Sequence, residues 1–388
     1  MSDSTQHHSA TSDVTIVYPS IGYTGGVERV MAEVLKFLFN NNYQIQVICS
    51  EMDDSLRPLC SKVHTIRIQK SNHLLWDMFH TAHWMLQAGR QAKLANKLKS
   101  RIISAPCALF TADLVMAGSC HIAAQFERLK RGSFKWLLNP RHWFYIFCEA
   151  SIFLRNQSQI LVPSKRTKSE IDCFYPPAKN RIHVVPHGVD SSIFYPADGS
   201  KTEIRTSIGL PEDAVIFLTV TNEIKRKGCL IVLEALKLIE QNGVKFHYLV
   251  VGRDDSSELL SKARDLGLES VVSAMPGVHG AELVRLFQAS DLFVLPTEYE
   301  SFGLVGIEAL ACGLPVLCTK VGGLEDYVTN GQDGIFVERT SADIARGLKY
   351  FFSLTSDAKR DMRDLAIEKS RAYQWSEVLQ PILAILNK

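Results

Sequence analysis

The sequence lacks several features that mark common classes of protein. It has no run of eighteen or more apolar residues, and its first dozen residues, MSDSTQHHSATS, are polar, so neither a membrane-spanning helix nor a signal peptide is predicted. The nine cysteines form no CxxC pair and show no metal-ligand spacing with histidines, which indicates reduced thiols and no structural zinc. Lys and Arg number 43 against 41 Asp and Glu, so a dedicated nucleic-acid-binding protein is not indicated.

The composition is that of a globular protein of more than one domain. The chain has 388 residues, of which 46% are hydrophobic and 22% charged, so sizeable cores and two domains are predicted. Residues 1–12 are predicted to be a disordered polar N-terminus. We expect a cytoplasmic protein. Peripheral contact with the inner face of the membrane is an open alternative.

Short apolar runs alternate along the chain with longer amphipathic stretches, the pattern of repeated βα units and a parallel sheet. We therefore predict an α/β protein with two Rossmann-like doubly wound domains facing each other across a cleft. The first-half strands are expected at 14–18, 45–49, 63–68, 113–116, 159–162 and 183–185. Those of the second half are expected in VIFLTV, FHYLVV, VVSA, DLFVLP and PVLC, from residues 215, 246, 271, 291 and 315.

The predicted domain boundary falls in a stretch rich in Pro, Gly, Asp and Ser. Residues 186–200, PHGVDSSIFYPADGS, cannot sustain a helix or a central strand. We assign 13–190 to an N-terminal domain and 191–372 to a C-terminal domain. Residues 373–388 are predicted to form a helix that packs back on the N-terminal domain.

The strongest motif is TEYESFGLVGIEALACGLPVLCTKVGGLEDYV, residues 297–328. Glu300 and Glu308 lie eight residues apart, and Phe302, Gly303 and Leu304 open a helix between them. A helix N-terminus offers unpaired N–H groups and a partial positive charge, so a phosphate fits there and the carboxylates can accept hydrogen bonds from sugar hydroxyls. In the alternative, Glu300 only caps the helix and Glu308 is a solvent-exposed helix residue. The apolar residues on either side of Glu308 argue against its exposure to solvent.

This E-x7-E segment, followed by a Gly-Leu-Pro-Val strand and Gly-Gly-Leu-Glu, resembles the family-4 retaining glycosyltransferases with the GT-B fold. The resemblance covers most of the chain, and it implies that 13–190 is the acceptor-side domain and 191–372 the nucleotide-sugar donor domain. It implies that Glu300 binds donor-sugar hydroxyls, that Glu308 binds the nucleotide ribose, and that backbone amides at Phe302, Gly303 and Leu304 hold the diphosphate.

A second match is NEIKRKG, which follows the strand VIFLTV. Arg226 and Lys227 precede a glycine at a strand-to-helix turn, where cations can neutralise a leaving diphosphate without a metal. The segment resembles the Arg-Lys-Gly phosphate clamp of the same family. Asn222 stands where many members have an Arg, so Arg226 is expected to supply the second charge; a solvated basic turn is the alternative.

Other candidate residues depend mainly on the resemblance. Gly25 and Gly26 permit unusual backbone conformations and close approach of a ligand, and the matching loop of the family lies under the donor phosphates. His121, after a predicted strand, matches a histidine that contacts the donor sugar. The alternative is a half-buried histidine whose ring is hydrogen-bonded within the protein and has no role toward a substrate. Arg253 and His279 fall in loops that surround the nucleotide base in the family.

The stretch from Arg128 to Cys148 holds five Lys or Arg, no Asp or Glu, and six aromatic residues. Such a segment can contact an anionic membrane or a lipid-linked acceptor, or it can build core with its arginines in solvent.

These observations predict a retaining, metal-independent glycosyltransferase without a cofactor. It would move a sugar from a nucleotide sugar to a saccharide or lipid-linked acceptor, in cell-surface polysaccharide or glycolipid biosynthesis. The alternatives are a sugar-nucleotide epimerase of the same fold and a non-catalytic nucleotide-sugar-binding regulator. A nicotinamide-dependent dehydrogenase is disfavoured because the first strand is followed by Gly-Tyr-Thr-Gly-Gly and not by G-x-G-x-x-G.

Overall fold

The chain folds into two compact units. The computed structural model describes residues 13–23, 25–69, 74–97, 99–106, 112–130, 132–155, 158–240 and 243–387, so the predicted disordered terminus, 1–12, lies outside the described residues. The first unit runs to Val185 and takes up the chain again from Leu379, and the second unit spans Pro186–Val378. In the described part of the chain, no helix is both long and apolar enough to cross a membrane.

The first unit contains a parallel sheet with strand order β5-β3-β1-β6-β7-β8-β9. Its inner strands are short, largely buried apolar runs, as parallel sheets require, whereas the edge strand β5 is half-buried or exposed. The short strand β6 was not predicted, because RIIS offers only two strongly apolar residues. The strands are β1 (Asp13–Val17), β3 (Gln44–Cys49), β5 (Lys62–Thr65), β6 (Arg101–Ser104), β7 (Leu114–Met116), β8 (Gln159–Val162) and β9 (Ile182–Val184), and a separate pair joins β2 (Ser20–Ile21) to β4 (Glu51–Met52).

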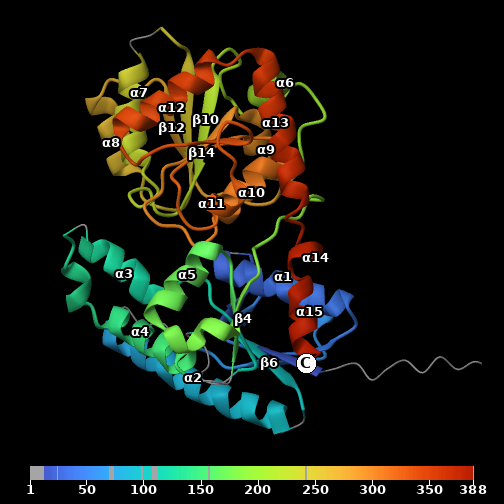
Figure 1. The fold of residues 1–388 in the computed structure, drawn as a ribbon. Helices are drawn as coiled ribbons and strands as arrows, with labels where there is room; N and C mark the ends of the chain where they lie inside the picture. Colours follow the sequence, from blue (N-terminus) through green and yellow to red (C-terminus); the bar gives the residue numbers. More distant parts are fainter. Residues whose placement is uncertain are drawn as a thin grey trace, which may run out of the picture. The chain divides into compact units, whose positions relative to one another are not determined.

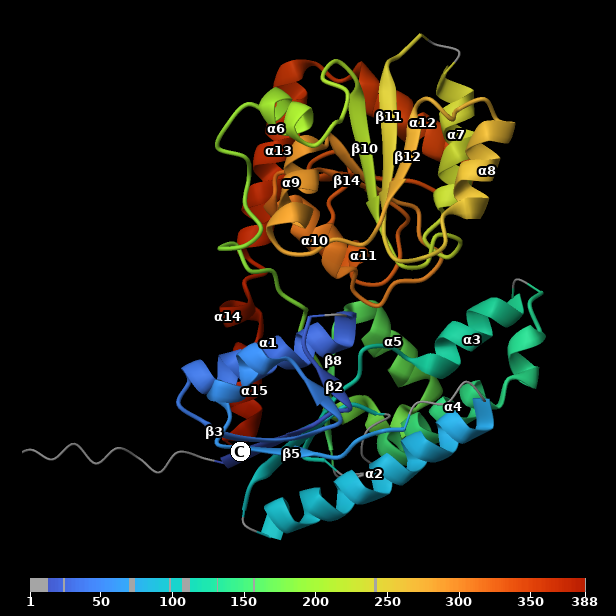
Figure 2. The ribbon, with the colours of Figure 1, turned by 180° about the vertical axis from the view of Figure 1, so that it is seen from behind.

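Helices cover this sheet on both faces (Figures 1 and 2). On one face, a core that includes Trp84, Ile152 and Phe153 is enclosed by α2 (Leu74–Lys97), α3 (His121–Lys130), α4 (Pro140–Phe153) and α5 (Lys165–Phe174). The unit also contains α1 (Gly26–Asn40) and α15 (Gln380–Leu386), and Tyr43, shortly after α1, donates to Asn387 Oδ1, directly after α15, at 3.0 Å. Short 3-10 turns complete the unit at η1 (Asp54–Leu59), η2 (Lys135–Leu138) and η3 (Pro176–Arg181).

The second unit has a six-stranded parallel sheet with order β12-β11-β10-β13-β14-β15. Counted along the unit, this is the order 3-2-1-4-5-6 of a Rossmann fold. The five predicted strands are present, and the three-residue β15 was missed. The bounds are β10 (Val215–Val220), β11 (Phe246–Val251), β12 (Val272–Met275), β13 (Leu292–Leu295), β14 (Val316–Cys318) and β15 (Gly334–Phe336).

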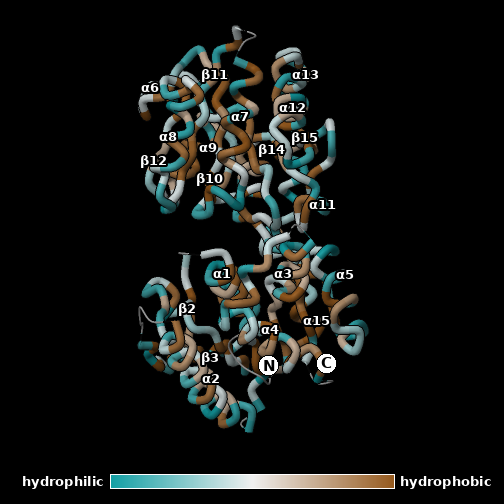
Figure 3. The backbone as a smooth tube through the Cα atoms, turned by 90° about the vertical axis from the view of Figure 1, so that its left-hand side faces the viewer, coloured by the Kyte–Doolittle hydropathy of each residue, from teal (hydrophilic) through white to brown (hydrophobic). Residues whose placement is uncertain are grey.

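Two apolar layers sandwich this sheet, and the hydrophobic colouring of Figure 3 follows its strands. Helices α7 (Cys229–Glu240), α8 (Ser257–Asp265) and α12 (Ser341–Ser353) pack on one face. Helices α9 (Ala281–Ala289), α10 (Leu304–Ala311) and α11 (Leu324–Tyr327) pack on the other. The remaining helices of the unit are α6 (Lys201–Ser207), α13 (Ser356–Arg371) and α14 (Trp375–Val378).

The unit boundaries differ from the predicted ones at 190/191 and 372/373. The backbone N–H of Val189 donates to Tyr373 O at 2.7 Å, and Val189 also forms a bridge with Gln374. A Cβ on Gly188 would lie 2.8 Å from the Trp375 backbone, so the two segments are in close contact. Residues 186–190 and 373–378 therefore belong to the second unit, and only the chain from Leu379 belongs to the first.

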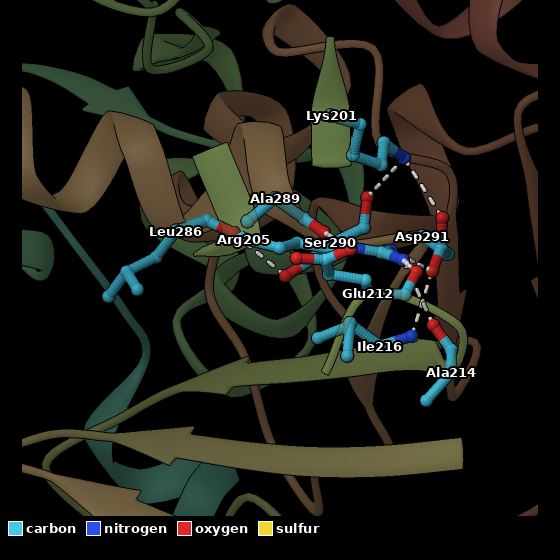
Figure 4. A network of polar contacts seen from close by, with 9 residues as sticks. All are labelled: Lys201, Arg205, Glu212, Ala214, Ile216, Leu286, Ala289, Ser290 and Asp291. Carbon is cyan, nitrogen blue, oxygen red and sulfur yellow. Dashed lines mark hydrogen bonds and ion pairs between the residues drawn. The ribbon is translucent and has the colours of Figure 1, made fainter. Parts of the chain in front are cut away.

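A buried ion cluster fastens the amino ends of β10 and β13 (Figure 4). Arg205 donates to Ala289 O at 2.9 Å and pairs with Asp291, whose other oxygen accepts from Lys201 at 2.9 Å. Burial opposes the Asp291 charge, but Lys201 and Arg205 outweigh it and lower the pKa of this carboxyl. Because ligands of such folds bind at the carboxyl ends of strands, this cluster has a structural role.

Candidate functional site

The second-unit motifs meet at one point of the sheet. Strands β10 and β13 are neighbours although they are separated by two other strands in the sequence, and this is where the strand order reverses. The turns that follow them carry NEIKRKG and TEYESFG. Ligands of open α/β sheets bind at the carboxyl ends of the strands at such a switch point, so both motifs lie where a site is expected.

Lys227 and Glu300 form an ion pair across this switch point. Their side chains are only 10% and 12% exposed, so each charge depends on the other for most of its stabilisation. Gly228 has a φ of 83°, and a Cβ there would lie 2.5 Å from Pro296 O. Glycine at this position therefore lets the two turns approach closely enough for the pair to form.

Two arginines hold the turns together. Arg226 donates to Glu223 and to the carbonyl oxygen of Tyr299, so its guanidinium is already engaged. Burial opposes its charge, but Glu223 and then Glu300 raise the pKa of Arg226. Arg339 donates to Pro296 O at 3.2 Å and to the Lys225 carbonyl at 2.9 Å.

The helix that separates the two glutamates begins at Leu304, two residues later than predicted. Its N-cap, Gly303, has a φ of 87°, which favours glycine, and the buried hydroxyl of Tyr327 donates to Gly303 O at 2.7 Å. Of the first-turn N–H groups of α10, that of Gly306 donates to Gly303 O at 2.9 Å, whereas those of Leu304 and Val305 precede any helical acceptor and can bind an anion. Glu308, on the second turn, is 1% exposed and is not a solvated helix residue.

Phe302 lies in an aromatic cluster of the core. Its ring is 5.1 Å from that of His187 and 5.2 Å from that of Tyr327, and the residue is 1% exposed. A donor contact at Phe302 would thus come from its backbone. The backbone of Glu300, two residues before Phe302, packs against Gly322. A Cβ on Gly322 would lie 1.7 Å from Glu300 O, so glycine at position 322 allows the Gly322–Gly323 segment to fit against Glu300.

The predicted base-side residues lie at the neighbouring strand end. The Asn222 side chain accepts from the Arg253 N–H at 2.9 Å, which joins the turns after β10 and β11. The Arg253 stem lies against Gly277, where a Cβ would be 2.8 Å from Arg253 Cγ. His279 is exposed in the loop before α9. Asn222 therefore positions the turn after β11, and Lys227 is the candidate for the contact with the diphosphate.

Gly25 and Gly26 have ordinary backbone conformations. Gly25 is extended, with φ −143°, and Gly26 is the first residue of α1. Neither has a positive φ, so neither uses a conformation that only glycine permits, and their place under the donor phosphates stays a prediction. A Cβ on Gly26 would meet nothing within 4 Å, which leaves the expectation of close ligand approach in place.

His121 is the first residue of α3, after β7. Its Nε2 lies 3.0 Å from His142 Nδ1 and 3.3 Å from Gln125 Nε2, and its backbone N–H donates to Glu149 Oε1 at 2.7 Å. Burial, then His142 and Arg128, lower the pKa of His121 to about 4. Burial raises the pKa of Glu149 to about 8.

The basic and aromatic stretch from Arg128 to Cys148 divides between core and surface. Trp136 is buried, whereas Phe147 is 64% exposed and Phe134 and Trp143 are also exposed. Arg141 pairs with Asp77 of α2. Arg131 lies outside the described residues. The surface continues onto α2, which sequence reasoning did not single out and which exposes Leu75, Trp76, Phe79, Leu86 and Leu94.

Several residues of these sites escaped sequence reasoning. Arg339 lies outside both motifs, and no local pattern marks it; Tyr327 lies within the 297–328 motif, but its contact with Gly303 was not predicted. Gln125 and Arg128 follow His121 at helical spacing, a signal that could have associated them with it. Among the described residues, no group of three or more His, Cys, Asp or Glu side chains could hold a metal ion.

Two family models match this chain. "Glycosyltransferase Family 4" matches residues 24–193, and "Glycosyl transferases group 1" matches residues 200–370. The D-inositol 3-phosphate glycosyltransferase 1 of Catenulispora acidiphila is 31% identical over 239 residues, 58% of this chain and 56% of that protein. The matched stretch thus spans about half the length of such curated relatives.

Solved structures share the whole fold. WaaG, a glycosyltransferase involved in lipopolysaccharide biosynthesis, has a TM-score of 0.78 and 20% identity over 96% of this chain and 98% of its own. Anabaena HepE in complex with UDP-glucose has a TM-score of 0.71 and 16% identity over 97% of this chain and 99% of its own. Two Rossmann-like units of this kind are the architecture of GT-B glycosyltransferases. The chain belongs to the family-4 glycosyltransferases of that fold.

Proposed function

We propose that this protein transfers a sugar, with retention of anomeric configuration, from a nucleoside diphosphate sugar to a saccharide or lipid-linked acceptor. The observation that carries the proposal is the Lys227–Glu300 pair beside the N-terminus of α10, at the switch point of the second unit. Family membership supports glycosyl transfer, and a protein of the same fold has been solved with UDP-glucose.

The proposed chemistry separates a sugar cation from a diphosphate. Lys227 and the first-turn N–H groups of α10 stabilise the negative charge that develops on the leaving diphosphate. When the diphosphate binds Lys227, Glu300 is released from the ion pair and can accept hydrogen bonds from the sugar hydroxyls. Glu308 accepts hydrogen bonds from the ribose, and its burial makes this contact strong.

Metal independence follows from the same charges. The role of a divalent cation at a diphosphate is to supply positive charge, which Lys227 and the α10 N-terminus provide here. Arg226 adds to the local potential through its position near Glu300. Retention is an inference from the family.

The test begins with a thermal-shift screen over nucleotide sugars, because a ligand that binds only the folded state raises the melting temperature. The donor found is then incubated with saccharide acceptors in excess chelator, and proton NMR couplings assign the product anomer. Transfer with retention is expected. Activity that returns only with magnesium or manganese would contradict the electrostatic account, and an inverted product would contradict retention.

The alternatives give other products in the same assay. A sugar-nucleotide epimerase isomerises the donor without forming an acceptor product, and a non-catalytic regulator binds the donor and leaves it unchanged. The presence of Lys227, Glu300 and Glu308 together favours transfer over the regulator.

We further propose that an anionic membrane presents the acceptor, in cell-surface polysaccharide or glycolipid biosynthesis. Exposed Phe134, Trp143 and Phe147 accompany the cations Lys130 and Lys135 in the α3–α4 region of the first unit. Aromatic side chains enter the membrane interface while cations attract anionic lipids, so this surface combines both contributions.

A further inference from the structure

The ring of His121 is held by two neighbours on one nitrogen. His142 Nδ1 and Gln125 Nε2 both lie within hydrogen-bond distance of His121 Nε2, at 3.0 and 3.3 Å. A neutral imidazole carries its single proton on one nitrogen, and the partner contacts decide which. The function of His121 toward a substrate depends on this choice.

Arg128 fixes the orientation of the Gln125 amide. Its Nη1 lies 3.1 Å from Gln125 Oε1, and a guanidinium can only donate, so this amide oxygen is the acceptor. The amide nitrogen, which can only donate, must therefore face His121. Gln125 is 2% exposed, so solvent offers no competing partner.

The proton of His121 follows from this orientation. Because the amide N–H of Gln125 donates to it, His121 Nε2 must present a lone pair. The contact with His142 then requires that His142 Nδ1 carries the proton and donates, since His121 Nε2 has none to give. The proton of the neutral His121 ring is consequently on Nδ1.

The surrounding charges keep the ring neutral. Burial, His142 and Arg128 lower the pKa of His121, and burial, Arg128 and Arg141 lower that of His142. Glu149 of α4 accepts from the His121 backbone N–H, and burial raises the pKa of Glu149 to about 8. This carboxyl is therefore protonated near neutral pH, and it does not offset the lowering of the two histidine pKa values. The Tyr145 ring, 5.4 Å from that of His121, completes the surroundings.

We propose that Gln125 and Arg128 are positioning residues that lock His121 in the neutral Nδ1–H tautomer. His121 then meets a sugar hydroxyl of the substrate as a hydrogen-bond donor and does not act as a base. The role toward substrate rests on the proposed function, whereas the tautomer does not.

The first experiment observes the tautomer directly. Protein labelled with ¹⁵N-histidine is studied by two-bond ¹H–¹⁵N correlation NMR, and His121→Asn assigns the resonances. We expect a protonated Nδ1 and an unprotonated Nε2 from pH 8 down to pH 5. A ring with its proton on Nε2, or one that becomes charged near its ordinary pKa, would overturn the proposal without reference to activity.

The second experiment replaces the hydrogen-bond donor at position 125 with an acceptor. In Gln125→Glu the carboxylate can only accept, so His121 should move its proton to Nε2, and the pKa of the ring should rise. Loss of one oriented hydrogen bond to the substrate should lower kcat about tenfold, while the Kd of the free nucleoside diphosphate, which we assign to the second unit, stays unchanged. Gln87→Glu is the matched control, because Gln87 contacts His83 at 2.7 Å with the same spacing on α2.

Arg128 provides a second variant if Gln125→Glu does not fold. Arg128→Met frees the amide, so a mixture of tautomers is expected, whereas Arg128→Lys, which can still donate to Gln125 Oε1, should restore the Nδ1–H form. A switched tautomer with unchanged transfer would overturn the donor role of His121. If the wild type shows no transfer with any donor, the proposed function fails while the NMR result still decides the tautomer.

Discussion

The two units share a strand order through their first six strands but differ in the chemistry at the carboxyl edge. In the second unit a Lys–Glu pair, two further arginines and a helix N-terminus surround the switch point. In the first unit the polar contacts of His121 are made by an amide, a second imidazole and a buried carboxyl. The same fold therefore offers one edge where ion pairs gather and one where side chains without an ion pair contact His121, with Arg128 held behind Gln125.

This difference shows how a fold can divide a reaction with a charged and an uncharged partner. A diphosphate needs fixed positive charge and exposed N–H groups, and a sugar needs oriented donors and acceptors without strong charge. Charge at Lys227 is balanced by Glu300 until a ligand arrives, which limits the cost of burying it.

The largest effect is expected from Lys227→Ala. Loss of a preorganised cation at a leaving group costs about 10²- to 10³-fold in kcat, by analogy with the removal of one oxyanion-hole donor. The variant also leaves Glu300 buried without its partner, so affinity for the nucleoside diphosphate should fall. Steady-state kinetics and calorimetry measure both quantities, and circular dichroism checks the fold.

Lys225→Ala is the matched control for that variant. Lys225 lies in the same turn, but its side chain is 72% exposed and pairs with the exposed Glu258. Near-normal activity is expected. An equal loss in both variants would assign the effect to the turn as a whole and contradict a specific clamp at Lys227.

Glu308→Ala should weaken nucleotide binding by about tenfold, since a buried carboxylate that accepts from a ribose contributes about as much as one charged hydrogen bond. Isothermal titration with the free nucleoside diphosphate measures it. Glu282→Ala, at an exposed position on α9, serves as the control. Unchanged affinity in Glu308→Ala would remove Glu308 from the donor site.

The sequence was sufficient for the second unit because its information is local. The Gly303 helix cap, the Gly228 turn and the two glutamates lie within short segments, so strand position and motif spacing predicted where they meet. Arg339 could not be predicted, because it reaches the site only through the tertiary fold, and the same holds for the contact of the Tyr327 hydroxyl with Gly303. The strands β15 and β6 were missed although β14, as short as β15, was predicted from the apolar run PVLC; GIF and RIIS each hold only two apolar residues.

The first unit was predicted less well for a related reason. Glycine at positions 25 and 26 permits a special φ, but the local geometry is extended and then helical, so no backbone conformation distinguishes these two residues. The orientation of His121 depends on His142, twenty-one residues away, on a different helix. Side chains that act through one another leave no spacing rule in the sequence.

The basic and aromatic surface of the first unit predicts weak, salt-sensitive binding to anionic vesicles. Each Lys or Arg near such a surface contributes about 1 kcal/mol, so Lys135→Gln should lower the partition coefficient about fivefold at low salt. Screening within ~10 Å at 0.1 M salt should abolish most of the binding. Lys349→Gln, exposed on α12 of the second unit, should have no effect, and absence of co-sedimentation at low salt would exclude this surface as a membrane contact.

The last expected effect concerns pH and has opposite signs in the two units. Burial between Phe302 and Trp375 lowers the pKa of His187 to about 3, so below its ordinary value of 6.5 the unfolded chain binds a proton that the folded second unit does not. This unit therefore loses stability as the pH falls from about 6.5, by at most about 1.4 kcal/mol per pH unit. Glu149 in the first unit has its pKa raised from 4.5 to about 8, so the folded state retains a proton that the unfolded chain releases, and stability falls as the pH rises through that window.

His187→Phe should gain stability relative to wild type as the pH falls from 7 to 5, and Glu149→Gln should gain as the pH rises from 5 to 8. Hydrogen exchange followed separately in each unit measures both slopes, and slopes of the same sign in the two variants would contradict this assignment of the buried groups.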